Sequence, residues 1–213
     1  MIRVGIADDE DLVRDGLAAL LSSQAGIIVV STVSSAAEAI ELADSGSIDV
    51  LLLDIHLGGR GGIDALREIV HQASARRGDP VGVIIVSSMS QEEFGVRAIR
   101  SGAAAFVPKA SSPDLLTEAI RTVASGRRYL TPRIAELLAD FAEHGPDDAH
   151  QSLSHREYEV FELLAAGRSV TEVSEQLSLS VSTVSTYRAR ILEKLRVDST
   201  AAVIRYAAQR GLV

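Results

Sequence analysis

Over the first 125 residues, short apolar runs alternate with segments of helical periodicity. The runs are Ile2–Ala7, Ile27–Val33, Asp49–Asp54, Val81–Ser88 and Ala104–Lys109. Each run is too short for a typical core helix, and most are rich in valine and isoleucine, which favours strands. Between the runs, apolar residues recur three and four positions apart, and this spacing predicts amphipathic helices, as in the stripe of Val13, Leu17, Leu20 and Leu21. Before the last helix of this part, Ser112 and Pro113 form a typical helix start.

The alternation of strands and helices predicts the fold of this first part. Strand–helix–strand units cross over with a right hand and cover both faces of a parallel sheet with helices. Strands buried in this way need nearly continuous apolar residues, as these runs have. We therefore expect residues 1–125 to form an α/β domain with a five-stranded parallel sheet.

After Gly126 the pattern becomes helical throughout. Thr131 and Pro132 predict the start of a short helix that runs to about Glu143, and the polar stretch GPDDAHQS at 145–152 is typical of a linker. Two later helices, at about 170–177 and 182–195, are joined by a short turn, which indicates a helix-turn-helix. We expect an α/β domain at 1–125, a linker with a short helix at 126–148 and a small all-α domain at 149–213.

Composition narrows the class of protein. The chain has 213 residues, of which 46% are hydrophobic, enough for the cores of two domains. It has no cysteine, which excludes disulfides and thiolate metal sites. No apolar run approaches the roughly 18–20 residues of a membrane span, and the N-terminus lacks the pattern of a secretion signal. We expect a cytoplasmic protein with no membrane partner.

Charge is divided unevenly along the chain. The net charge of −8 argues against nucleic-acid binding by the whole molecule, but residues 1–150 carry 13 basic and 22 acidic side chains, whereas residues 151–213 carry 8 and 7. The segment Val181–Arg196 concentrates four cations against the single acid Glu193. A cationic recognition helix that contacts phosphates and bases fits this segment, and so does an ordinary solvated helix face.

Polar residues follow the predicted strands where a parallel sheet places its ligand site. The first strand ends at Asp8 and Asp9, the third at Asp54, the fourth at Ser87 and the fifth at Lys109. Clustered carboxylates repel one another, and a bound Mg²⁺ would remove that conflict while leaving positions for phosphate oxygens.

This set of residues suits phosphoryl transfer. Asp54 could act as the nucleophile that forms an aspartyl phosphate, with Lys109 and the cation neutralising the phosphoryl oxygens. Taken singly, the residues have plainer interpretations: Asp8 or Asp9 could cap the following helix, Ser87 could be a loop hydroxyl, and Lys109 a surface charge. Together they favour a phosphoacceptor site.

Residues 1–125 resemble the receiver domain of bacterial two-component response regulators. The resemblance rests on Asp8-Asp9, on Asp54 after LLL, on Ser87 ending the fourth strand, and on GAAAFVPKAS at Gly102–Ser111. It implies a flavodoxin-like (βα)5 fold with strand order 2-1-3-4-5. It also implies that a sensor histidine kinase phosphorylates Asp54, with Mg²⁺ or Mn²⁺ bound in the acidic pocket.

The receiver resemblance also assigns roles to residues. The implied metal ligands are Asp8, Asp9, Asp54 and the backbone carbonyl of His56; the implied phosphate-binding and switch residues are Ser87, Ser88, Lys109 and Phe106. The chain departs from the family at Gly58, where many receivers have proline, so the stretch Gly58–Ile63 is glycine-rich and could alter the metal loop. The His56 side chain could in addition modulate dephosphorylation.

The last 61 residues resemble the LuxR/FixJ-type helix-turn-helix domain, which has four helices. The resemblance rests on Leu153, Arg156-Glu157, Gly167, Thr183-Val184, Leu192 and Lys194-Leu195. It implies DNA contacts by Ser182, Thr183, Ser185, Thr186, Arg188, Arg190 and Lys194, and dimerisation through Ala201, Ile204 and Ala208 on a last helix at about 200–210. The family often has lysine where this chain has Thr171 and Ser185, and histidine where it has Tyr187. With fewer cations, we expect tight binding to need two copies on paired half-sites.

Together the two resemblances imply a transcriptional response regulator of the NarL/FixJ type and not an enzyme. Phosphorylation of Asp54 is expected to control formation of a homodimer and its sequence-specific binding to promoter DNA. A regulator of the same fold that works without phosphorylation is the main alternative. An aspartyl-phosphate phosphatase or phosphotransferase is disfavoured, because such enzymes usually carry a second carboxylate where this chain has His56.

Overall fold

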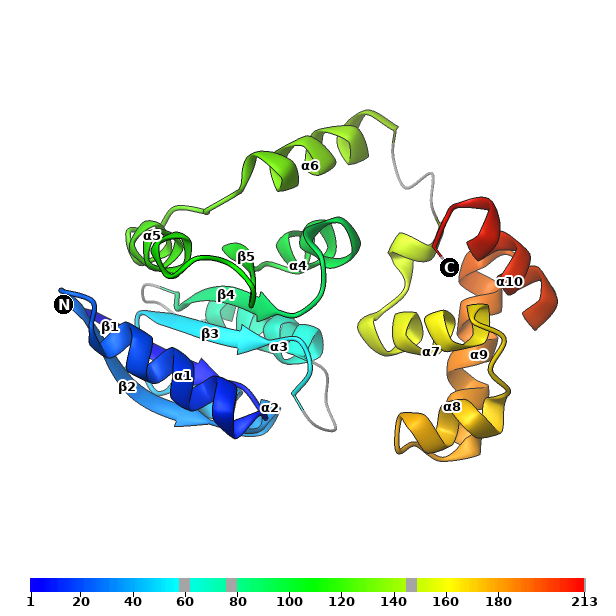
Figure 1. Ribbon diagram of the computed structural model, residues 1–213, viewed down its shortest axis with the longest axis horizontal. Helices are drawn as coiled ribbons and strands as arrows, with labels where there is room; N and C mark the ends of the chain where they lie inside the picture. The colour runs from blue at the N-terminus through cyan, green and yellow to red at the C-terminus, as the bar shows by residue number, and fades with distance from the viewer. Residues whose placement is uncertain (58–61, 76–79, 145–148, 213) are drawn as a thin grey trace. The chain divides into compact units, whose positions relative to one another are not determined.

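The chain folds into two compact units, Met1–Glu143 and His144–Val213, which are described separately. The computed structural model describes residues 1–57, 62–75, 80–144 and 149–212 (Figure 1). Two segments lie outside these ranges: residues 58–61, the first part of the glycine-rich stretch Gly58–Ile63, and residues 145–148, the first half of the expected linker stretch. In the described ranges, no helix has both the length and the apolar character needed to cross a membrane.

A five-stranded parallel sheet forms the centre of the first unit, in the order β2-β1-β3-β4-β5. Its strands are β1 (Ile2–Ala7), β2 (Ile27–Val33), β3 (Val50–Asp54), β4 (Gly82–Ser87) and β5 (Ala105–Pro108). The strands fall within the predicted apolar runs, and the predicted fold and strand order are confirmed. Every residue of β3 is buried, as expected for a central strand covered on both faces.

Helices cover both faces of this sheet (Figure 1). They are α1 (Asp11–Ser22), α2 (Ala36–Asp44), α3 (Gly62–Ala75), the short π-helix η1 (Gln91–Gly95), α4 (Val96–Arg100) and α5 (Pro113–Ala124). On one face, alternate strand residues such as Val4, Leu52 and Ile84 form a core with apolar residues of α1 and α5. The predicted start of α5 is confirmed, because the Ser112 side chain accepts a hydrogen bond from the Leu115 N–H.

The next helix, α6 (Pro132–His144), packs against the first unit. The Thr131 hydroxyl donates a hydrogen bond to the side chain of Gln91 in η1 and accepts one from the Ile134 N–H, which caps α6 as predicted. Ile134 is fully buried, with its side chain against Gly95. Two further pairs link α6 to η1 and α4, namely Arg133 with Glu92 and Phe141 with Arg100. The sequence placed α6 in the linker, whereas it completes the compact α/β unit.

The second unit is a small helical domain. It comprises a 3-10 turn, η2 (Ala149–Ser152), and the helices α7 (His155–Ala165), α8 (Val170–Gln176), α9 (Val181–Leu195) and α10 (Thr200–Gln209). A serine side chain caps the N-terminus of each of these four helices. The core consists mainly of Phe161, Val173, Val184, Ile191 and Val203. The predicted helix-turn-helix is formed by α8 and α9.

Candidate functional site

Polar side chains from three strands meet beyond the carboxyl ends of the sheet. Asp54 is the last residue of β3, Asp8 follows β1 and Lys109 follows β5. Asp8 and Asp54 are only 1% and 2% exposed. The Lys109 N–H donates to the Ser87 carbonyl over 2.7 Å, which fixes the end of β5 beside the end of β4. The structure therefore brings together four residues that the sequence predicted to converge.

One ammonium group serves three carboxylates in this pocket. Lys109 Nζ lies 2.9 Å from Asp8 Oδ2, 3.3 Å from Asp54 Oδ2 and 3.3 Å from Glu10 Oε1. Asp54 Oδ1 is buried and has no hydrogen-bond partner among the residues that the structure describes. A buried oxygen without a partner is costly, so the pocket is suited to a further positive or hydrogen-donating group.

The pKa values of the pocket follow from burial and from these charges. Burial raises the pKa of Asp54, the charge of Lys109 lowers it, and the negative charge of Asp8 raises it further. The result is a pKa above the ordinary value of an aspartate. Burial lowers the pKa of Lys109, but the hydrogen bond and charge of Asp8 and the charge of Asp54 outweigh burial and raise it to about 12. Lys109 therefore stays cationic at neutral pH and is available to an anionic phosphoryl group.

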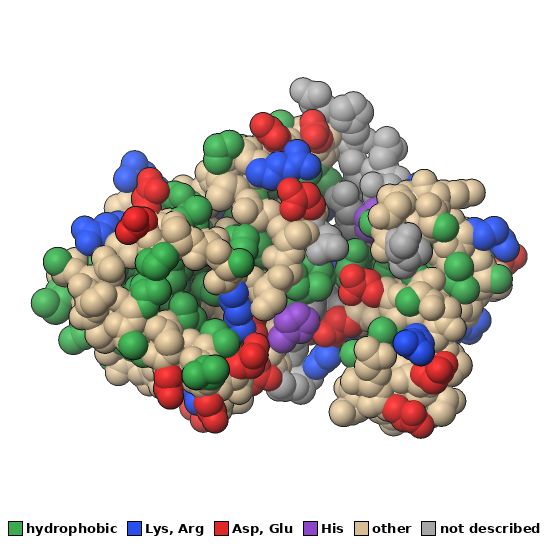
Figure 2. All heavy atoms as spheres, viewed as in Figure 1, with side chains coloured by type: hydrophobic (Ala, Val, Ile, Leu, Met, Phe, Trp, Pro, Cys, Tyr) green, Lys and Arg blue, Asp and Glu red, His purple; other side chains and the backbone are tan. Residues whose placement is uncertain are grey.

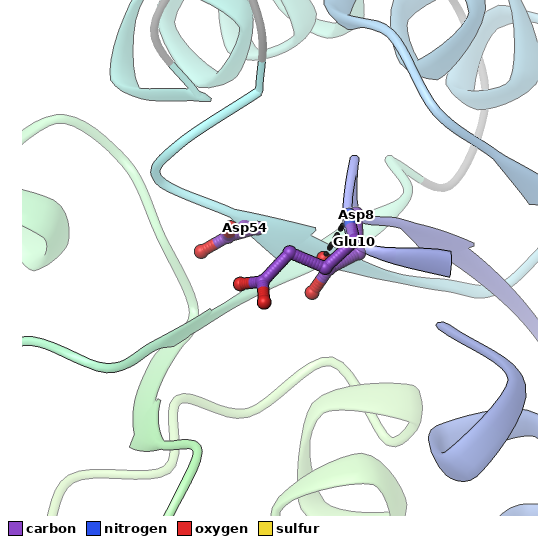
Figure 3. A group of neighbouring side chains, drawn as sticks. All are labelled: Asp8, Glu10 and Asp54. Atoms are coloured by element: carbon purple, nitrogen blue, oxygen red, sulfur yellow. Dashed lines mark hydrogen bonds between the residues drawn. The ribbon is translucent and has the colours of Figure 1, made fainter. Parts of the chain in front are cut away.

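The acidic residues could hold a divalent cation, though not in the predicted combination. One oxygen each from Asp8, Glu10 and Asp54 lie within 4.8 Å of one another (Figure 3). Asp9 is exposed and does not belong to this group. Clustered carboxylate oxygens are the ligands that Mg²⁺ and Mn²⁺ prefer, so the residues present fit such an ion.

Glu10 is the pocket residue that the sequence reasoning missed. It stands at the N-cap of α1, and its N–H donates to Asp8 Oδ1 over 3.0 Å, the dashed line in Figure 3. This tight turn directs the Glu10 side chain toward Asp54, while Asp9 faces solvent. The sequence showed only that Glu10 continues an acidic run, a signal that an exposed helix start would also give.

A close backbone approach positions the end of β3. The Gly62 N–H donates to the Ile55 carbonyl over 2.7 Å, and a Cβ at Gly62 would lie 1.9 Å from the Asp54 carbonyl oxygen. Glycine at the start of α3 is therefore needed to keep Asp54 where it is. The His56 side chain is exposed, and the role of its backbone carbonyl as a metal ligand stays a prediction.

The predicted switch residues lie on β4 and β5. Ser87 and Phe106 are fully buried, and the Ser87 hydroxyl accepts a hydrogen bond from the Met89 N–H over 3.1 Å. Ser88 is exposed. Ser87 thus sits between the pocket and the segment that leads into η1, a position from which a change at Asp54 could reach α4 and α6.

The predicted DNA contacts lie on α9, but some of its polar groups already have partners. Arg188 Nε donates to Thr200 Oγ1 over 2.7 Å, and Lys194 Nζ lies 2.5 Å from Glu157 Oε2. The Thr183 hydroxyl is hydrogen-bonded to the capping residue Ser180. The Ser182 hydroxyl is also hydrogen-bonded to Ser180, and the Thr186 hydroxyl donates to the Ser182 carbonyl over 3.0 Å. Ser185 and Arg190 are exposed. On the face of the helical unit in Figure 2, acidic and basic side chains are interspersed.

The predicted dimerisation residues lie together on α10. Ala201, Ile204 and Ala208 are all exposed and are spaced three and four residues apart, so they share one face of the helix. Ile204 is 36% exposed, so this face presents a large aliphatic side chain to the surface. Dimerisation through this face stays a prediction.

Comparison with protein families matches both units. Residues 4–121 match the response regulator receiver domain, and residues 151–207 match the luxR family of bacterial regulatory proteins. The response regulator GacA of Pseudomonas aeruginosa is 34% identical, with 100% of this chain and 98% of GacA covered. The response regulator UvrY of Escherichia coli is 33% identical, with 100% and 96% covered.

Solved structures show the same arrangement of elements. The response regulator ChrA of a heme-sensing two-component system is 31% identical, with a TM-score of 0.54. The match covers 100% of this chain and 98% of the ChrA chain. RcsB of Salmonella enterica serovar Typhimurium, bound to a promoter in the presence of the phosphomimetic BeF3⁻, matches with a TM-score of 0.60. The match covers 98% of this chain and 99% of the RcsB chain. At 23% identity, RcsB supports the fold alone.

Proposed function

This chain belongs to the response regulators that join a receiver domain to a LuxR-type DNA-binding domain, and we propose that phosphorylation of Asp54 switches its activity as a transcription regulator. The observation that carries the proposal is the buried Asp54 carboxylate, which has one oxygen bound to Lys109 and the other without a hydrogen-bond partner in the described part of the chain. The unpartnered oxygen is the natural nucleophile.

In the proposed reaction, a phosphohistidine of a sensor histidine kinase donates the phosphoryl group. A carboxylate oxygen of Asp54 attacks phosphorus, the P–N bond breaks, and the histidine nitrogen leaves with the electron pair. Lys109 remains cationic and neutralises part of the charge on the phosphoryl oxygens. A Mg²⁺ or Mn²⁺ held by Asp8 and Asp54 would supply further charge neutralisation at these oxygens.

The proposed signal passes through β4. A phosphoryl group at Asp54 would attract the Ser87 hydroxyl, with Phe106 repacking beside it, and Ser87 lies directly before the segment that enters η1. Because Thr131 and Ile134 hold α6 against η1, a shift of η1 changes the packing of α6. The helix that precedes the DNA-binding unit thereby senses the state of the pocket.

The proposed output is DNA binding by a homodimer in the cytoplasm. Arg188 and Lys194 are engaged within the helical unit, which leaves fewer free cations on α9 for phosphates. Two copies on paired half-sites would double the contacts, and the exposed face of α10 with Ile204 is available to join them.

The test combines phosphorylation with DNA binding. The full chain is incubated with a small phosphodonor and Mg²⁺, and its mass in solution and its affinity for sites selected from random DNA are measured. We expect the donor to promote dimerisation and tighten binding in the wild type and in Asp49→Asn, a matched change of an aspartate directly before the same strand. Asp54→Asn should respond to neither.

The alternative is a regulator that binds DNA without phosphorylation. It would show equal dimerisation and equal DNA affinity with and without the phosphodonor, and Asp54→Asn would behave as the wild type. The crowded acidic pocket favours the first proposal, because without a cation or a phosphoryl group its buried charges are only partly compensated.

A further inference from the structure

Val181 is an exposed apolar residue at the start of α9, and the luxR-type resemblance leaves it without a role. It directly follows the capping residue Ser180 and is 50% exposed. In the described part of the helical unit, the one other exposed large aliphatic side chain is Ile204, which lies on the predicted dimer face. Single exposed apolar residues are common on protein surfaces, so the surroundings of Val181 decide whether it has a function.

The polar groups around Val181 are largely engaged with one another. The hydroxyls of Ser182 and Thr183 are both hydrogen-bonded to the capping Ser180. The Thr186 hydroxyl donates to the Ser182 carbonyl over 3.0 Å. The capacity of these hydroxyls to bind base edges is therefore partly used within the helix, whereas the methyl groups of Val181 are half exposed.

The first turn of α9 also differs in charge from the first turns of the two preceding helices. In α7 and α8, Glu157 and Glu172 stand three residues after the capping serine and complete a capping box. The corresponding residue of α9 is Thr183, and its first turn has no acidic side chain. A carboxylate at a helix start stabilises the helix but would repel DNA phosphates. The start of α9 is thus free of the charge that would oppose contact with DNA.

One group of DNA complements an apolar side chain at this place. The N-terminal residues of a recognition helix contact base edges in the major groove, where thymine alone presents a methyl group. Ser185 and Ala189 follow Val181 at intervals of four residues, and both are exposed, so the three share one face of α9. This face is uncharged and offers no guanidinium for a bidentate contact with guanine. It therefore favours contact with thymine.

We propose that Val181 is a base-contacting residue that reads the methyl group of a thymine in each DNA half-site. This inference rests on the proposed function, in which a homodimer binds promoter DNA. The Val181 side chain packs against the thymine methyl and removes both apolar groups from water. Val181 thereby sets part of the sequence specificity, while the cations of the unit supply attraction to phosphates that does not depend on sequence.

Removal of a single methyl group from the DNA tests the proposal. Sites are selected from random DNA with the full, phosphodonor-treated chain, and each thymine of one half-site is replaced in turn by deoxyuridine, which lacks only that methyl. One replacement should weaken wild-type binding about fourfold, the effect of one buried methyl group. In Val181→Ala the same replacement should change the affinity less than about 1.5-fold, because the partner of the methyl is gone.

Val170→Ala is the matched control, because Val170 directly follows the capping serine of α8 as Val181 follows that of α9. This variant should keep the full loss of affinity on removal of the thymine methyl. Since Val181 is half exposed, its truncation leaves the core of the unit in place. The proposal is overturned if no replacement weakens wild-type binding more than about 1.5-fold, or if Val181→Ala is as sensitive as the wild type.

The response to the phosphodonor separates this inference from the proposed function. If the donor changes neither dimerisation nor affinity, while methyl removal weakens the wild type and spares Val181→Ala, the role of Val181 stands and the proposed function is wrong. If the donor tightens DNA binding, while methyl removal weakens Val181→Ala as much as the wild type, the role of Val181 is wrong and the proposed function stands.

Discussion

The chain has only two lysines, and each lies against a buried acid, one in each unit. In the α/β unit, Lys109 is shared by Asp8, Asp54 and Glu10. In the helical unit, Lys194 contacts Glu157, which is 3% exposed. The two sites look alike in a list of ion pairs, but their hydrogen bonds differ.

The difference lies in how fully the acid is satisfied. Glu157 Oε2 accepts hydrogen bonds from the Ser154 N–H over 2.6 Å and from Lys194, and burial is outweighed so that the pKa of Glu157 is lowered. Asp54 shares its lysine with other acids, keeps one oxygen without a partner in the described part of the molecule, and has a raised pKa. The pair at the proposed binding site thus leaves a buried acceptor oxygen unsatisfied, whereas the Glu157 oxygen has two donors.

The largest expected effect is that of removing Lys109 on the rate of phosphoryl transfer to Asp54. Lys109→Met takes away the group that neutralises the phosphoryl oxygens, and the rate of phosphoryl uptake from a small donor should fall at least about 100-fold. Lys194→Met, the matched change in the helical unit, should leave that rate unchanged. The rate is measured from acid-labile phosphate on the intact chain, and equal losses in the two variants would contradict the distinction.

Removal of Glu157 should have the largest effect on stability. Glu157→Ala removes the capping box of α7 and leaves Lys194 without its buried partner, so the helical unit should lose about 3 kcal/mol. Glu172→Ala removes the exposed capping box of α8 and should cost about 1 kcal/mol. Hydrogen exchange of the α7 and α9 amides measures both. Equal costs would show that the buried pair adds nothing to the cap.

Neutralising Asp54 should change stability less than removal of Glu157 does, and in the opposite direction. Because burial and Asp8 raise the pKa of Asp54, the ionised carboxylate disfavours folding, and Asp54→Asn should stabilise the α/β unit by about 1 kcal/mol at neutral pH without divalent cations. Glu157→Gln should instead destabilise the helical unit. Urea unfolding followed by hydrogen exchange distinguishes the two units. A loss of stability in Asp54→Asn would show that the carboxylate is satisfied after all.

The smallest expected effect is a difference between Asp54 and Glu157 in how their contribution to stability depends on pH. The folded-state pKa of Asp54 is raised, so its destabilising effect appears as pH rises through the window above the ordinary aspartate pKa of about 3.9 and is absent below it. The pKa of Glu157 is lowered, so its stabilising effect is present above the ordinary glutamate pKa and is lost as pH falls through the folded-state value. The stability gain of Asp54→Asn should therefore vanish at acid pH, which unfolding curves of wild type and variant at several pH values check.

Much of the fold could be predicted because its periodicities are strong. Strand order and helix positions followed from apolar runs, from capping residues such as Ser112 and from the family resemblance, and the convergence of Asp8, Asp54 and Lys109 followed from the parallel sheet. Docking of α6 could not be predicted, because a helix with one apolar face gives no sign of what that face covers, here Gly95 and its neighbours.

The limits of prediction at the sites have a physical cause as well. The sequence spacing shows which residues lie near a strand end, but a single turn decides which acid faces the pocket. Here the Glu10 N–H is hydrogen-bonded to Asp8, and the Glu10 carboxylate joins the pocket while Asp9 does not. In α9, the sequence pattern gave no sign that Arg188 and Lys194 have partners. Those partners, Thr200 on α10 and Glu157 on α7, are distant in sequence and become neighbours only in the fold.

The most direct test of the account is to locate the phosphoryl group chemically. The wild-type chain is treated with a small phosphodonor and Mg²⁺ and then with borohydride, which reduces an acyl phosphate to an alcohol, and the peptides are sequenced by mass spectrometry. We predict reduction at Asp54 alone, and only when Mg²⁺ was present. Reduction at Asp8, Asp9 or Glu10, or no reduction anywhere, would contradict it.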